Sequence, residues 1–78
     1  MTPKLPACTS RDVERVLLRA GFAAHHQVGS HRIFRDRTGL HRVTVPMHRS
    51  DLKRKTLRAI IRQAGLTPDD FFTLLHNS

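Results

Sequence analysis

The stretch GSHRIF, Gly29–Phe34, lies between two segments whose composition favours β-strands. A Gly-Ser pair in this position predicts a two-residue hairpin turn, because glycine accepts the positive φ that such turns require. His31 would then be the first residue of the strand that leaves the turn. We expect backbone pairing on both sides to hold His31, with its side chain at the end of the sheet.

Alternation along this strand predicts which of its side chains are buried. Arg32 and Phe34 share one face, and His31, Ile33 and Arg35 share the other. Burial of the larger aromatic side chain predicts Phe34 inside and His31 on the solvent side. Position alone leaves two roles open for His31: an ordinary surface residue, or a functional one, since histidine side chains titrate near neutral pH.

Two further strands are expected beside this one. Phe22–Val28 precedes the turn, and His41–Val45 follows a loop and ends at Pro46. In the first of these strands, strict alternation would point His25 and His26 to opposite faces. The adjacent pair would then make a poor metal site, and we expect no metal in this chain.

Helix signals frame the three strands. Thr9–Asp12 has the pattern of a capping box, and Gly21 ends the helix that follows it. A second helix is expected from Asp51 to Gly65, and Thr67–Asp70 predicts the start of a short third helix. The order helix, three strands, helix, short helix predicts an α+β fold, a three-stranded antiparallel meander with helices on one face and the other face open. Three arginines of the first helix are expected on its solvated face: Arg11, Arg15 and Arg19.

Length and composition limit the function classes. The chain has 78 residues, 38% of them apolar and 5% aromatic. It predicts one domain over residues 1–78, with an extended lead-in over 1–8, and no enclosed cavity for a cofactor. Cys8 is the only cysteine, which excludes a disulfide framework and a thiolate metal cluster. No secretory or membrane-spanning segment is evident, so we expect a cytoplasmic protein without membrane association.

Charge is concentrated in the middle of the chain. Net charge is +8, and the segment from His31 to Arg62 holds ten Lys and Arg residues against two Asp residues, so it carries all of that net charge. Clustering of this kind favours a nucleic-acid partner over an evenly solubilising surface.

Cations crowd the first turn of the expected second helix, where the macrodipole disfavours them. A helix start that binds phosphate would explain this placement. Seven residues are the predicted RNA contacts: Arg32, Arg49, Lys53, Arg54, Lys55, Arg58 and Arg62.

Three blocks in this order resemble the HicA family of mRNA interferase toxins: Gly29–His31 (GSH), Val43–Pro46 (VTVP) and Leu57–Leu66 (LRAIIRQAGL). The resemblance extends from about Thr9 to Leu75. It implies a double-stranded-RNA-binding-like α-β-β-β-α fold, cleavage of mRNA by the histidine of the turn, and inhibition by a HicB-type antitoxin. Lys55 departs from the family pattern, in which glycine often stands there.

The chemistry of the residues agrees with this resemblance. RNA cleavage without a metal needs a base for the 2′-hydroxyl, a donor for the leaving oxygen and cations for the phosphate. His31 suits the first role. His48 is a candidate acid or phosphate contact, and His41 is less well placed. The six scattered acidic residues form no carboxylate cluster for a metal.

Two functions therefore stay open at this point. One is a ribonuclease toxin with His31 as the catalytic residue, and the other is a non-catalytic RNA-binding module. A DNA-binding role through the second helix is less favoured, because that helix presents a row of cations rather than base-reading polar residues.

Overall fold

A computed structural model describes residues 5–77. The elements follow in the order α1 (Ser10–Arg19), β1 (Ala23–Val28), β2 (His31–Arg35), β3 (Arg42–Pro46), α2 (Arg54–Gln63) and α3 (Pro68–His76). The predicted α+β class and element order are confirmed, and the strand limits differ from the expected ones by no more than one residue. None of the three helices in the described part of the chain is long and apolar enough to cross a membrane.

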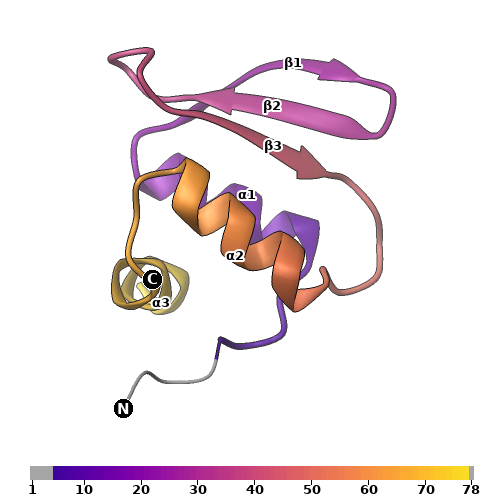
Figure 1. Cartoon of the computed structure of the whole chain (residues 1–78), viewed down its shortest axis with the longest axis vertical. Coiled ribbons are helices and arrows are strands. Elements are labelled where there is room, and N and C mark those ends of the chain that lie inside the picture. Colours follow the sequence, from indigo (N-terminus) through magenta and orange to yellow (C-terminus); the bar gives the residue numbers. More distant parts are fainter. Residues whose placement is uncertain (1–4, 78) are drawn as a thin grey trace.

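The three strands form an antiparallel sheet in the order β1-β2-β3. Helices α1 and α2 lie against one face, the other face is open, and α3 packs on α1 away from the sheet (Figure 1). Phe34 pairs with Val43 on the covered face, and both side chains are fully buried. The core between sheet and helices also contains Val13, Val16, Leu17, Leu57, Ile60 and Phe71.

Local signals account for the ends of α1 and α3. Thr9 and Thr67 each form a capping box, with Asp12 and Asp70 as the reciprocal partners. Arg19 differs from the expectation of a merely solvated residue. Its guanidinium donates a hydrogen bond of 2.6 Å to the carbonyl oxygen of Leu74, so it satisfies a backbone acceptor in the last turn of α3.

β1 departs from strict alternation. Its pairing with β2 shifts register between Ala24 and His26, which makes His25 the extra residue of a β-bulge. The two imidazoles therefore converge instead of pointing apart, with their Nδ1 atoms 2.9 Å from each other. The expectation that His25 and His26 point to opposite faces was wrong, because the alternation rule assumes a regular strand and does not apply across a β-bulge.

Helix α2 does not begin at Asp51, where the sequence predicts its start. Asp51 forms an isolated antiparallel bridge with Thr9, and Leu52 N–H donates to the Cys8 carbonyl oxygen at 2.7 Å. Leu52 and Cys8 are both buried, so this extended pairing joins the lead-in to the core. The helix begins at Arg54, after that pairing ends. The expected lead-in over 1–8 falls partly on residues 1–4, which lie outside the described residues.

Candidate active site

The turn between β1 and β2 positions His31. Gly29 has a φ of +58°, the conformation that the turn prediction required. His31 pairs with Val28 of β1 on one side and with Pro46 of β3 on the other. The carbonyl oxygen of Ser30 accepts a hydrogen bond of 2.6 Å from the backbone N–H of Met47, which closes this end of the sheet. The backbone of His31 is thus held on both sides while its side chain is exposed, as the sequence predicted.

An open groove brings His31 together with the first turn of α2. It runs along the outer edge of β3, where the side-chain oxygen of Gln63 accepts a hydrogen bond of 3.3 Å from the backbone N–H of Thr44. Its volume is about 440 Å³, and its lining consists of His31, Thr44, Pro46, Lys55, Thr56, Ala59, Ile60 and Gln63. Residues that carry an imidazole, an ammonium group and a hydroxyl therefore border one solvent-accessible space that could admit a phosphodiester.

The first turn of α2 lacks the capping features of the other two helices. Its N-cap is Lys53, no side chain caps its backbone N–H groups, and the first turn contains no acidic residue. Lys53, Arg54 and Lys55 are all exposed. The partial positive charge of the helix start and these three cations add at the same place, which favours an anion there.

Comparison with known protein families shows to which family the chain belongs. The family model described as "HicA toxin of bacterial toxin-antitoxin" matches residues 10–66. The chain belongs to the HicA toxin family. The match begins with α1 and ends just before α3, so it contains His31, the sheet and the whole of α2. A search of curated proteins returned no match.

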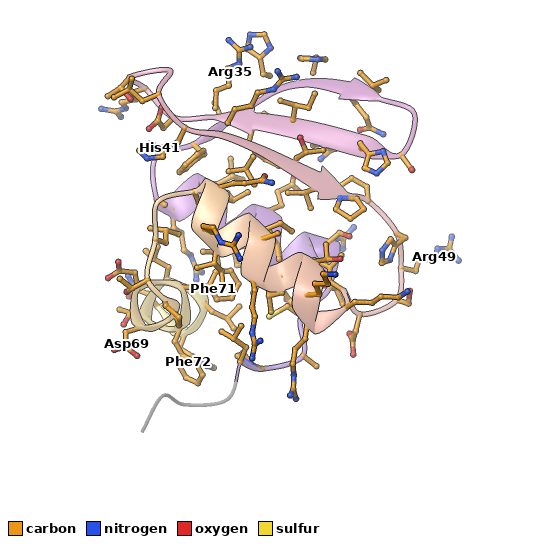
Figure 2. The ribbon with its side chains drawn as sticks, in the orientation of Figure 1. Arg35, His41, Arg49, Asp69, Phe71 and Phe72 are labelled. Atoms are coloured by element: carbon orange, nitrogen blue, oxygen red, sulfur yellow. The ribbon has the colours of Figure 1, made fainter. Side chains whose placement is uncertain are left out.

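Two predicted residues of this HicA toxin lie in a second hollow. It has a volume of about 520 Å³ and is lined by Thr9, Ser10, Arg11, Met47, His48 and Arg49. His48 contacts Ser50 through its Nδ1 atom, at 3.1 Å from the carbonyl oxygen. Arg49 extends from the segment between β3 and α2 into solvent (Figure 2). This hollow shares no lining residue with the His31 groove, so the structure does not bring His48 and His31 into one pocket.

Arg32 is placed on the covered face, away from the exposed side of His31. Its guanidinium forms an ion pair with Glu14 of α1 and donates a hydrogen bond of 3.1 Å to Gln27. Arg32 therefore links β2 to α1. By contrast, Arg58 and Arg62 are exposed along α2 beyond its first turn.

His41 directly precedes β3, at the end of the sheet where Arg35 pairs with Arg42 and opposite the end where His31 pairs with Pro46. Its Nδ1 atom is 2.7 Å from a carboxylate oxygen of Asp36. The side-chain hydrogen bond with His41 lowers the pKa of Asp36 from 3.8 to about 2. This pair closes the loop between β2 and β3 and takes no part in the His31 groove.

The open face of the sheet carries two arginines that are not among the seven predicted RNA contacts. Arg35 of β2 lies directly opposite Arg42 of β3, and both are exposed. Alternation along β2 is enough to place Arg35 on the same face as His31. The partner of Arg35 could not be inferred, because the register of β3 depends on the conformation of the loop before it.

Proposed function

We propose that this HicA toxin is a metal-independent endoribonuclease that cleaves mRNA in the cytoplasm, with His31 as its catalytic residue. The observation that supports the proposal is the groove that His31 lines together with Lys55 and Thr56 of the first turn of α2. His31 would supply the base and Lys55 the cation, two of the three groups that RNA cleavage by an internal nucleophile requires.

The reaction would use the 2′-hydroxyl of the RNA as nucleophile. The His31 imidazole removes its proton while the 2′-oxygen forms a bond to the adjacent phosphorus. The bond from phosphorus to the 5′-oxygen breaks, and that oxygen leaves as a hydroxyl after taking up a proton from solvent water. The products are a 2′,3′-cyclic phosphate and a 5′-hydroxyl end. Lys55 and the backbone N–H groups at the start of α2 would stabilise the extra negative charge on the phosphate.

Toxins of this kind act with an antitoxin, and we propose a HicB-like protein as the partner. The net charge of +8 between His31 and Arg62 would attract an acidic surface. An antitoxin that covers the groove would block access of RNA to His31.

Analysis of the RNA ends tests the proposed activity. Purified protein is incubated with single-stranded RNA in excess EDTA, and the new ends are identified by their susceptibility to phosphatase and kinase. We expect cyclic-phosphate and 5′-hydroxyl ends, formed at the same rate with and without EDTA. Bound but intact RNA would instead indicate a non-catalytic RNA-binding module, and cleavage that EDTA abolishes would contradict metal independence.

A further inference from the structure

The open face of the sheet carries an unbalanced cationic pair. Arg35 and Arg42 are directly opposite across β2 and β3, and like charges in that arrangement destabilise a sheet. Within residues 5–77, neither guanidinium forms an ion pair or a side-chain hydrogen bond. Figure 2 shows Arg35 rising from the sheet on the side away from the helices. Two exposed arginines at directly paired positions can both reach one phosphate group, which guanidinium groups bind through paired hydrogen bonds.

The surface between this pair and His31 is free of negative charge. The strand residues on the open face include no Asp or Glu. The adjacent acid, Asp36, is occupied by hydrogen bonds with Thr38 and His41. Between the two ends lies Ile33, which pairs with His26 and Thr44 and is only 6% exposed although it is outside the main core.

The spacing suits a single nucleic-acid strand. Arg35 is four residues after His31 in the same extended strand, which separates the two positions by about 13 Å along β2. Alternation keeps both on the open face. His31 also borders the groove beside α2, so it stands where that groove meets the open face.

We propose that Arg35 and Arg42 form a second phosphate-binding subsite, and that single-stranded RNA lies across the open sheet face from His31 to this pair. The inference rests on the proposed function in one respect: His31 is taken as the point at which the bound RNA is cut. It adds the path of the strand beyond that point. The destabilisation that comes from placing two like charges opposite each other is offset when a phosphate binds between them.

The test uses a double variant, Arg35→Ala with Arg42→Ala, in a His31→Ala background so that the RNA is not cut. Its affinity for an oligonucleotide of roughly 12 nucleotides, within the range one small domain covers, is measured at several salt concentrations. We expect the slope of log affinity against log salt to fall by about 0.7 for one phosphate contact or about 1.4 for two. The unfolding temperature should stay the same or rise, because a repulsive pair has been removed.

Arg15→Glu is the matched control in the same background. It lowers the net charge by the same amount as the double variant, but on α1, behind the covered face. Its salt slope should change little. If the double variant keeps the slope of its parent, or if the slope of the control falls as much, the subsite does not exist. If the native protein binds RNA through these arginines without cutting it, the subsite stands and the proposed nuclease activity fails.

Discussion

At the scale of single residues, replacement of His31 should change the cleavage rate without changing the stability of the fold. The backbone of His31 is paired on both sides, but its side chain is exposed. We therefore expect His31→Ala to lower the cleavage rate by about 10²–10⁴-fold, the usual contribution of a general base. The unfolding temperature and the affinity for RNA should change little. Cleavage rate, melting temperature and RNA affinity are measured on the same preparation.

His48→Ala is the comparison for that experiment. Because His48 lines a separate hollow, its replacement should weaken cleavage only mildly. A reduction as large as that of His31→Ala would identify His48 as the general acid. A stable His31→Ala protein with full activity would contradict the catalytic role of His31.

Asp36 predicts a pH effect on stability. Its pKa in the folded protein is about 2, below the ordinary value of 3.8, so the folded state favours the ionised carboxylate. This contribution to stability is present above pH 3.8 and is lost as the pH falls through about 2. Asp36→Asn should be less stable than the native protein near pH 5, and the difference should shrink with acidification. Urea midpoints across that pH range measure it, and a constant difference would show that the charge of Asp36 is irrelevant.

At the scale of elements, the cations at the uncapped start of α2 should contribute to RNA affinity but not to the stability of the protein. Replacement of Lys53, Arg54 and Lys55 by Ala should flatten the salt dependence of RNA affinity, by about 0.7 in the logarithmic slope for each phosphate that the variant no longer neutralises. The variant should be at least as stable as its parent, since each cation in a first turn costs a few tenths of a kcal/mol. Fluorescence titration at several salt concentrations and thermal melting make the two measurements. An unchanged slope would place the phosphate-binding residues elsewhere.

Gly65 follows the end of α2 and lies close to His41, which stands at the end of the loop between β2 and β3. Its φ is +71°, and a Cβ atom there would lie 2.6 Å from Nε2 of His41. Gly65→Ala should reduce the free energy of unfolding by more than the roughly 1–2 kcal/mol of the left-handed backbone alone. Gly39→Ala is the control, with a φ of +74° but open space around its Cβ position. Equal reductions in the two variants, measured by denaturant unfolding, would show that the contact with His41 adds nothing.

At the scale of the whole molecule, charge and topology predict how the toxin is restrained. The cations of the first turn of α2 and Arg49 lie toward the same end of the sheet as His31, while α1 and α3 carry the acidic residues of the capping boxes. An acidic antitoxin that binds this end should hide the groove from RNA. Co-expression with the HicB-like partner should yield a tight complex without cleavage activity, measured with the RNA used for the free toxin. A complex that co-purifies but still cleaves would exclude occlusion as the mechanism.

The sequence by itself determined the elements of this protein and the side of the sheet on which its key residues lie. Capping boxes at Thr9 and Thr67 and the turn at Gly29 depend on contacts within a few residues, so local composition is enough to place them. Burial of Phe34 and exposure of His31 followed from alternation and size alone.

Only the tertiary structure decided which distant residues meet. The bulge at His25, the pairing of Asp51 with Thr9 and the contact of Arg32 with Glu14 all depend on long-range register. The same register sets Arg42 opposite Arg35 and brings Lys55 to the groove of His31. Each of these contacts is selected by the free energy of packing two elements together, which no single segment of the chain contains.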